Sequence, residues 1–261
     1  MKEFNSNDWQ KILNDNDLGN FDALWQLDAG WFEQPNQRRG GWSGVSKIKL
    51  ALPGGGEVWA FLKRQENHLS KTLLHPIKGV STFQKEYQNI LSFIKKGLPT
   101  VEPIYFGHRD LKGNLQAILI TRELEGYQSL SSSQFCRNGE IMNQKVERIA
   151  ILRSLAAVMV KMHGFHLQHN CLYPKHVFVK KEDDRWDVRL IDLEQLKWRL
   201  FKRTSTLRDI GTMYRHGALY ENGMFSQLLF LKFYRDEKKL SEASKAIWRA
   251  VRKSALSKTR G

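Results

Sequence analysis

Two short stretches of the chain decide the fold: residues 168–179, QHNCLYPKHVFV, and residues 190–194, LIDLE. The apolar run 177–179 and the apolar run 188–191 are separated by the acidic turn 181–184, a pattern that predicts a β-hairpin. The first stretch carries His169, Cys171 and His176, and the second places Asp192 directly after an apolar strand. These side chains are candidates for proton transfer and for metal binding.

The region around these stretches is mainly helical. Apolar residues at helical spacing predict a helix over about 143–163, with Gly164 as its stop and these residues facing inward: Ile149, Leu152, Leu155, Ala156, Met159 and Met162. The serine-rich segment 127–138 has the composition of a connection, and the sequence after residue 207 is helical and basic. Residues 126–261 are therefore expected to form a helix-rich lobe.

The N-terminal part has a different pattern. Alternating residues predict strands at 48–52 and 57–63 around the turn 53–56, and two further strands at 101–107 and 115–121. A helix is predicted from Ser81 or Thr82 to about residue 94, ended by Gly97. The first 35 or so residues are polar, with a few aromatic anchors. Residues 1–125 are expected to form a strand-rich lobe with one helix, which gives an α+β fold of two lobes.

Several residues of chemical interest occur in a meaningful order. A glycine-rich turn (Gly40, Gly41 and Gly44) precedes Lys63 near a strand end, and Glu86 lies on the following helix. Phosphoryl transfer from a nucleotide uses parts of this kind: a glycine turn that lets backbone amides approach phosphates, a lysine held by a carboxylate, and ligands for Mg²⁺. No single part is specific, but the ordered set favours a nucleotide-dependent phosphotransferase.

On these residues the sequence resembles the lipopolysaccharide kinases of the Kdo/WaaP group, in the protein-kinase-like superfamily, over roughly residues 38–217. The two stretches quoted above resemble most the InaA-like branch of that group. The resemblance implies a bilobal protein-kinase-like fold, the cofactors ATP and Mg²⁺, and phosphorylation of a sugar of the lipopolysaccharide inner core. It also implies a cytoplasmic enzyme, peripheral on the cytoplasmic face of the bacterial inner membrane.

The resemblance also assigns roles near the nucleotide. It implies that Lys63 binds phosphates and that Glu86 is its helix partner. It implies that Arg122, Glu123 and Leu124 form the hinge that holds adenine through backbone groups.

Further roles are implied for the C-terminal lobe. His169 matches the first residue of the catalytic loop, His176 stands at a metal-binding position, and Asp192 matches the Mg²⁺-binding aspartate. Glu194 stands where the protein-kinase motif has glycine, and Asp209 is a candidate for the buried aspartate that braces the catalytic loop.

The sequence departs from the kinase pattern at Cys171, which occupies the position of the catalytic aspartate. A free thiol is mostly neutral at pH 7 and a poor acceptor, and loss of a positioned proton acceptor costs roughly 10²–10⁴-fold in rate. Either another acid substitutes, with Glu194 the nearest candidate, or the protein is a weak kinase or a pseudokinase that binds a nucleotide or an anionic partner without transfer. The glycine turn also lacks G-x-G-x-x-G spacing, which leaves its individual contacts open.

The charge of the chain indicates an anionic partner. The net charge is +15, and residues 197–261 hold 16 of the 42 Lys and Arg but only 5 of the 27 Asp and Glu. The basic segment 197–208, interleaved with Trp198, Leu200 and Phe201, suits a glycolipid phosphate or an anionic membrane surface, or is a solvated loop. A C-terminal helix around 241–254 either lies on lipid or packs through Trp248 and Val251.

Other classes of protein are less well supported. Charge alone would suit nucleic acid, but the sequence has no helix-turn-helix, RRM or zinc-finger pattern. The histidines around Cys171 lack the usual spacings of a zinc site. With 41% hydrophobic residues, two cysteines and no apolar N-terminal segment, the 261-residue chain is expected to be a cytosolic globular protein without disulfides or a signal peptide. The oligomeric state has no signature in the sequence.

Overall fold

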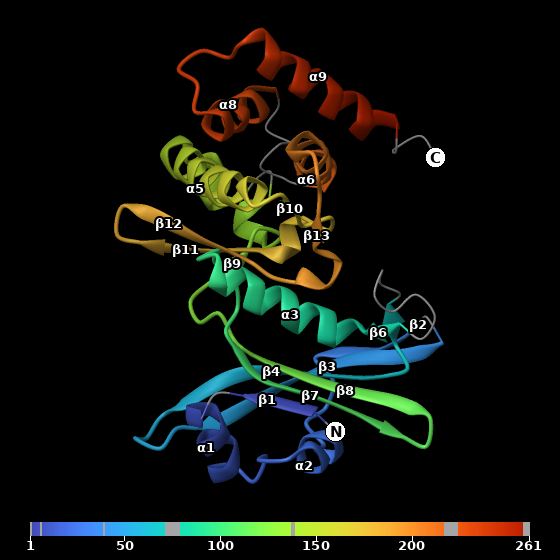
Figure 1. The fold of residues 1–261 in the computed structure, drawn as a ribbon. Helices are drawn as coiled ribbons and strands as arrows, with labels where there is room; N and C mark the ends of the chain where they lie inside the picture. The colour runs from blue at the N-terminus through green and yellow to red at the C-terminus, as the bar shows by residue number, and fades with distance from the viewer. Residues whose placement is uncertain are drawn as a thin grey trace. The chain divides into compact units, whose positions relative to one another are not determined.

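The computed structural model describes residues 2–5, 7–38, 40–70, 79–136, 139–216 and 224–257. Gly217, at the end of the predicted resemblance, and residues 137–138 of the predicted connection lie outside this part. The chain divides into two compact units, the first made of Met1–Ser92 and Val101–Leu124 and the second of Phe93–Thr100 and Glu125–Gly261. The first unit is rich in strands and the second is mainly helical, which confirms the α+β class (Figure 1).

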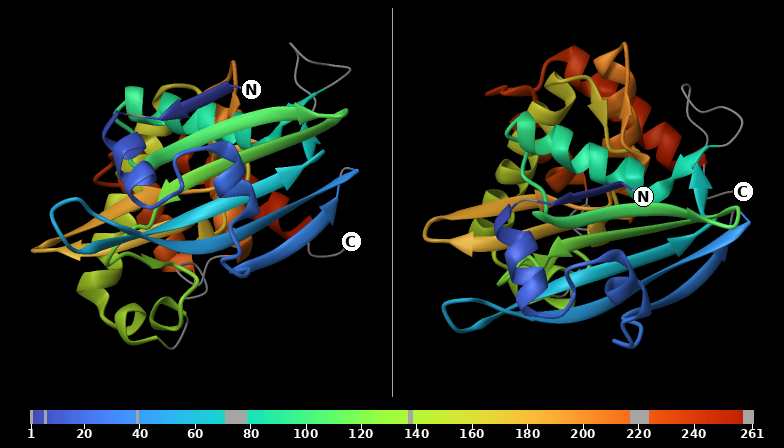
Figure 2. Two further views of the ribbon diagram at one scale, coloured as in Figure 1. Left: turned by 90° about the horizontal axis from the view of Figure 1, so that it is seen from below. Right: turned by 60° about the horizontal axis from the view of Figure 1, so that its bottom comes forward.

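A six-stranded antiparallel sheet forms the body of the first unit (Figure 2). Its strands, in spatial order, are β1 (Lys2–Asn5), β7 (Pro103–Leu111), β8 (Asn114–Arg122), β4 (Glu57–Glu66), β3 (Gly41–Ala51) and β2 (Glu33–Arg38). The predicted strands are present, and β1 and β2 extend the sheet beyond them. The β3–β4 hairpin turns at Gly55 and Gly56, whose φ angles of 88° and 84° favour glycine.

The register of β4 decides which side chains face which side of the sheet. Lys63 lies opposite Val45 of β3 and Leu119 of β8. Because successive side chains of a strand point to opposite faces, Leu62 faces one side and Lys63 the other. Leu62 belongs to the hydrophobic core of the sheet, so Lys63 is displayed on the opposite face.

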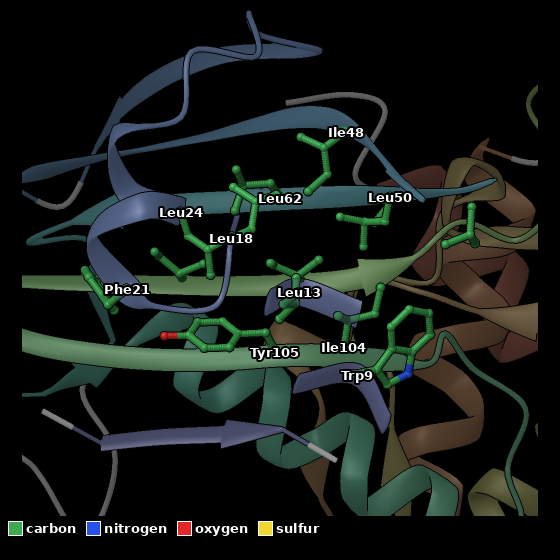
Figure 3. Close-up of a cluster of buried hydrophobic side chains, with 14 residues drawn as sticks. Trp9, Leu13, Leu18, Phe21, Leu24, Ile48, Leu50, Leu62, Ile104 and Tyr105 are labelled. Atoms are coloured by element: carbon green, nitrogen blue, oxygen red, sulfur yellow. The ribbon is translucent and has the colours of Figure 1, made fainter. Parts of the chain in front are cut away.

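Two helices that the sequence did not predict cover the core face: α1 (Asn7–Asp15) and α2 (Phe21–Gln26). Trp9 and Leu13 of α1 and Phe21 and Leu24 of α2 are buried in one cluster with sheet residues (Figure 3); its sheet members include Ile48, Leu50, Leu62, Ile104 and Tyr105. The expectation of one helix in this lobe is therefore wrong. Both helices are short, of nine and six residues, and helices of this length are stable only through packing, here against the sheet.

A buried arginine fixes the chain that follows α2. Arg64 of β4 donates hydrogen bonds from one nitrogen to the carbonyls of Trp25 (2.9 Å) and Leu27 (2.8 Å), and from another to Ser46 Oγ (3.1 Å). Its guanidinium lies 4.7 Å from the ring centre of Trp31. Burial lowers the pKa of Arg64 from its ordinary value. This side chain ties the N-terminal extension to the centre of the sheet.

Helix α3 (Thr82–Lys95) covers the opposite face of the sheet with its first turns (Figure 1). It follows two short paired strands, β5 (Leu69–Ser70) and β6 (Val80–Ser81). The Ser81 hydroxyl accepts a hydrogen bond from the amide of Gln84 (3.0 Å), as an N-cap residue does. Gly97 follows the helix with a φ of 61°, so the predicted start and stop are both confirmed.

The second unit is built around helix α5 (Lys145–Gly164), which confirms the predicted long helix. All five predicted inward residues after Ile149 are at most 1% exposed, and Ile151 rather than Ile149 is fully buried. In the described part of this unit the other α-helices are α4 (Glu140–Asn143), α6 (Lys202–His216), α8 (Met224–Arg235) and α9 (Glu242–Ser257). Short 3₁₀ turns lie at Ser133–Phe135, Pro174–His176 and Leu193–Gln195. The short strands β9 (Gln128–Ser129), β10 (Leu167–Gln168) and β13 (Lys197–Trp198) complete the unit.

Strands β11 (Val177–Glu182) and β12 (Arg185–Leu190) form the predicted hairpin. It is joined to α5 through Glu147, which accepts from Lys181 Nζ (2.6 Å) and from the Trp186 indole N–H (2.7 Å). These two donors hold the pKa of Glu147 below its ordinary value. The hairpin is therefore anchored to α5, and Asp192 lies just beyond the end of its second strand, β12.

Two expectations for the basic C-terminal region change in the structure. Helix α6 begins at Lys202, so only the first part of the segment 197–208 is an extended loop. Helix α9 packs into the second unit, because Val251 is buried and Trp248 Nε1 donates to Gln227 Oε1 (3.2 Å). Of the two interpretations of this helix, packing through Trp248 and Val251 is the one observed.

Candidate active site

The candidate residues fall into two sets, one in each compact unit, and each set is described within its own unit. The set in the first unit centres on Lys63 and Glu86, and the set in the second unit centres on the loop 169–176 and on Asp192.

In the first unit, Lys63 of β4 and Glu86 of α3 form an ion pair with an Nζ–Oε1 distance of 2.6 Å. The Glu86 side chain is only 4% exposed, and that of Lys63 is 20% exposed. Burying a carboxylate is costly unless a charged partner compensates it, so Glu86 fixes the direction of the lysine. The pair presents one oriented ammonium group at the sheet face, which is suited to binding an anion such as a phosphate.

The glycine turn joins β2 to β3, and two of its three glycines have packing reasons for lacking a side chain. Gly40 has a φ of 79° in the turn itself. A Cβ on Gly41 would collide with the backbone of Glu66, and one on Gly44 would lie 2.6 Å from the Trp31 ring. Glycine at positions 41 and 44 is thus explained by close packing, whether or not a phosphate approaches the turn.

The predicted hinge, residues 122–124, uses two of its backbone donors inside the first unit. The amide of Arg122 donates to the carbonyl of Glu102, and that of Glu123 donates to the carbonyl of Trp59, both at 2.9 Å. Neither of these two amides is available to a base, and the expected contact of this segment with adenine stays a prediction for its other backbone groups. The Glu123 side chain pairs with Lys47 Nζ at 2.7 Å.

Lys47 was missed by the sequence analysis. It lies two residues beyond Val45 on β3 and so on the same sheet face as Lys63, a relation that the alternation of the strand could have revealed.

In the second unit, Asp209 of α6 braces the loop that begins at His169. Its side chain is completely buried. The carboxylate accepts hydrogen bonds from the amides of His169 (2.8 Å) and Asn170 (2.9 Å) and from Nε2 of His163 (3.1 Å). His163, which the sequence analysis did not assign, also contacts the hydroxyl of Tyr234 (2.8 Å). Three donors on one buried carboxylate fix the backbone of the loop relative to α5 and α6.

His169 holds the strand end that carries Asp192. Its Nε2 lies 3.0 Å from the carbonyl of Ile191, which can only accept, so Nε2 carries the proton. Its Nδ1 is buried without a hydrogen-bond partner. Burial lowers the pKa of His169, in keeping with a neutral ring. The ring is fully buried and contacts the strand end, which is a positioning contact, and the catalytic role implied for His169 stays a prediction.

His176 and Asp192 meet at a point that fits a cation. Nδ1 of His176 donates to the carbonyl of Cys171 (2.8 Å), and its Nε2 lies 3.2 Å from Oδ2 of Asp192. Two neighbouring ligands of an octahedral cation of the size of Mg²⁺ lie roughly 3 Å apart, so the pair has the separation that such a site needs. Asp192 adopts a left-handed backbone conformation (φ 59°), which turns its carboxylate away from the line of β12. The described part of the chain contains no group of three or more His, Cys, Asp or Glu side chains arranged to hold a metal ion.

With this geometry in place, comparison with known proteins decides the family. The profile of the "Lipopolysaccharide kinase (Kdo/WaaP) family" matches residues 22–247. The chain belongs to the lipopolysaccharide kinase (Kdo/WaaP) family. It is 29% identical to Protein InaA of Escherichia coli (strain K12) over 181 residues, which cover 69% of this chain and 80% of that protein.

A solved structure described as "WaaP in complex with acyl carrier protein" superposes with a TM-score of 0.66 at 18% identity, covering 98% of this chain and 99% of that one. The kinase-like fold expected from the sequence is thereby confirmed.

Cys171 occupies the position at which the protein-kinase pattern has the catalytic aspartate. Its thiol is half-buried, and burial, together with the negative charges of Asp192 and Glu194, raises its pKa. The thiol is therefore protonated at neutral pH and is a weak acceptor. Glu194, the predicted substitute acid, lies in the 3₁₀ turn after Asp192 and accepts a hydrogen bond from Gln195 Nε2 (2.7 Å).

A cavity of about 380 Å³ opens beside the loop that carries Cys171. It is lined by Tyr173, Pro174 and Lys175 of the loop, by His216 at the end of α6, and by Leu130, Ser131 and Cys136. The rings of Tyr173 and His216 meet edge to face with centroids 4.9 Å apart. The sequence analysis did not single out these residues, because only the fold brings His216 to the loop. In the helices that the structure describes, no segment is long and apolar enough to cross a membrane.

Proposed function

We propose that this member of the family is an ATP-dependent, Mg²⁺-dependent phosphotransferase that acts on a sugar of the lipopolysaccharide inner core. The observation that carries the proposal is the Lys63–Glu86 ion pair, which holds one ammonium group in a fixed direction on the sheet. The family to which the chain belongs supports the acceptor class. We take residues 1–125 as the nucleotide-binding lobe and residues 126–261 as the substrate lobe.

In this proposal each unit supplies part of the chemistry. Lys63 binds the phosphates of ATP, and Glu86 keeps it oriented. The amides near Gly40 approach the same phosphates, and the carbonyls of residues 122–124 face the adenine. His176 and Asp192 would hold Mg²⁺, which neutralises charge on the phosphates when bound. His169 and Asp209 keep the loop and the strand end in register for that task.

A second candidate function follows from Cys171. A protonated thiol cannot orient and deprotonate an acceptor hydroxyl as a carboxylate does. The protein would then be a kinase-like pseudoenzyme that binds nucleotide, or an anionic membrane or glycan partner, without transfer. Where the pseudoenzyme binds nucleotide, the two candidates share the nucleotide site and differ only in the chemical step.

The acceptor is proposed to enter the cavity beside the catalytic loop. Tyr173 offers an aromatic surface for a sugar ring, and Lys175 offers a cation for the anionic groups of inner-core sugars. The substrate would be the lipopolysaccharide core glycolipid, so we place the protein in the cytoplasm, peripheral on the cytoplasmic face of the bacterial inner membrane. The excess of basic residues in the C-terminal part supports this placement.

Thermal denaturation with ATP, with and without Mg²⁺, tests the nucleotide site. At a hundredfold excess over Kd, bound ligand adds about 2.7 kcal/mol to stability, which is readily measured. We expect a Mg²⁺-dependent shift in the wild type that is lost in Lys63→Ala and Asp192→Asn. Lys49→Ala removes another lysine of the same sheet face and should retain the shift. Absence of a shift at millimolar ATP would refute the proposal.

The chemical step is tested with Cys171→Asp. We expect phosphate transfer from ATP to lipopolysaccharide core to rise by roughly 10²–10⁴-fold when the acid is restored. Transfer that stays undetectable in the variant, with ATP binding intact, would refute the account in which Cys171 limits transfer.

A further inference from the structure

Three large apolar side chains are exposed in a row on the second unit. Trp198, Leu200 and Phe201 are 63%, 63% and 70% exposed. They lie between the end of β13 and the start of α6 (Figure 1). Single exposed apolar residues are ordinary, but a contiguous group of this size usually marks a surface that is covered in use.

The segment that carries them is held in a fixed conformation. Strand β13 pairs with β10, and the amide of Arg199 donates to the carbonyl of His166 (2.8 Å). Nδ1 of His166 lies 3.0 Å from the Arg199 carbonyl and 3.1 Å from the Leu200 carbonyl. The His166 ring also stacks on Trp198 with centroids 5.9 Å apart. The exposure of the three side chains is therefore built into the fold.

The charged residues around these side chains indicate the chemistry of the partner. Lys197, Lys202 and Arg203 are exposed, and Arg199 is partly exposed. From Gln195 to Arg208 the sequence contains no acidic residue, and Asp209, which follows, is buried. A surface that alternates bulky apolar and cationic side chains matches a layer of anionic headgroups above hydrocarbon, where tryptophan is favoured.

We propose that residues 197–203, here called the docking segment, bind an anionic phospholipid surface, with Trp198, Leu200 and Phe201 entering the headgroup region and the basic side chains contacting lipid phosphates. The inference rests on the proposed function in one respect: it gives the catalytic loop access to an acceptor that lies in a membrane. The docking segment belongs to the same unit as Cys171 and Asp192.

Vesicle co-sedimentation of the full chain without nucleotide tests this surface. The probes are vesicles of phosphatidylcholine alone and vesicles that also contain phosphatidylglycerol. One variant, W198S/L200S/F201S, removes the apolar groups, and another, K202Q/R203Q, removes two charges. The matched controls are L111S/V146S, at exposed apolar positions elsewhere, and K238Q/K239Q, at exposed lysines elsewhere.

We expect binding that requires phosphatidylglycerol and weakens in high salt. Each basic residue near such a surface contributes about 1 kcal/mol, so K202Q/R203Q should bind roughly tenfold or more weakly. The apolar variant should lose at least as much, and both controls should bind within about twofold of the wild type. No binding to the anionic vesicles, or equal losses in variants and controls, would overturn the proposal. The proposal would also be overturned if the docking segment bound an acidic protein partner in a pull-down while the chain bound no vesicles.

The Mg²⁺–ATP thermal shift of the same variants separates the two proposals. It should be unchanged in all four, and unchanged melting temperatures without ligand exclude misfolding as the cause of lost binding. Vesicle binding without an ATP shift in the wild type would refute the nucleotide-dependent function and leave the docking segment standing. An ATP shift without vesicle binding would refute the docking segment and leave the nucleotide-dependent function standing.

Discussion

Replacement of Asp209 by alanine should destabilise the second unit more than any other single change in the loop region. The side chain is fully buried and accepts from two backbone amides and from His163 Nε2. Alanine would leave three buried donors unpaired, and each such loss costs about 1–3 kcal/mol. Some relaxation and water entry will offset part of this, so we expect a loss of about 3–5 kcal/mol, or about 10–15 °C in Tm for a unit of this size.

Urea unfolding followed by circular dichroism measures the loss, and hydrogen exchange at the amides of His169 and Asn170 locates it. Both amides should exchange much faster in Asp209→Ala. Asp209→Asn retains one acceptor oxygen and should lose about half as much stability. Asp184→Ala, in the exposed turn of the β11–β12 hairpin, is the matched control and should change stability by less than about 0.5 kcal/mol. The bracing role would be refuted if Asp209→Ala behaved like this control and left the exchange of both amides unchanged.

Three further predictions concern stability. Arg64→Met removes the hydrogen bonds to the carbonyls of Trp25, at the end of α2, and of Leu27, just after it, and should cost about 3 kcal/mol in urea unfolding; a loss below about 1 kcal/mol would contradict the anchoring role. Glu147 has a lowered pKa in the folded state, so its stabilisation is present above about pH 4.5 and is lost as the pH falls through the folded pKa. The stability difference between wild type and Glu147→Gln should therefore shrink as the pH falls below about 4.5, and a constant difference would refute the ion-pair account. Gly44→Ala should cost about 1–3 kcal/mol in stability because the added methyl group meets the Trp31 ring. A neutral effect would refute the packing explanation and favour a role of this glycine in binding the nucleotide.

Much of the fold was predictable because its signals are local. The β3–β4 hairpin is specified by alternation and by the glycines of its turn, and α3 by a serine cap and a terminal glycine. The resemblance implied that Lys63 and Glu86 are partners, and the structure pairs them. Strand alternation and helix capping act over a few residues, so a single sequence reveals them.

The parts that the sequence did not reveal depend on distant contacts. Helices α1 and α2 are too short to form alone, and they are stabilised by burial of Trp9 and Phe21 against the sheet. The resemblance singled out Asp209, but its contact with His163, 46 positions away in the sequence, has no local signal. Gly44 was assigned to a phosphate turn, whereas the nearness of Trp31 is visible only in the folded sheet.

The arrangement around Cys171 bears directly on whether the protein transfers phosphate. The loop backbone is fixed by Asp209, and the adjacent strand end is fixed by His169. These contacts are needed to place a side chain at position 171, yet the side chain there is a thiol whose pKa is raised by burial and by Asp192 and Glu194. In phosphoryl transfer, positioning and electrostatic stabilisation supply most of the rate, and the proton acceptor supplies a smaller share. If the proposed function holds, the oriented lysine and the Asp192–His176 pair would bind and polarise the nucleotide, and the group that prepares the acceptor would be missing. The expected behaviour is slow transfer on an intact binding site.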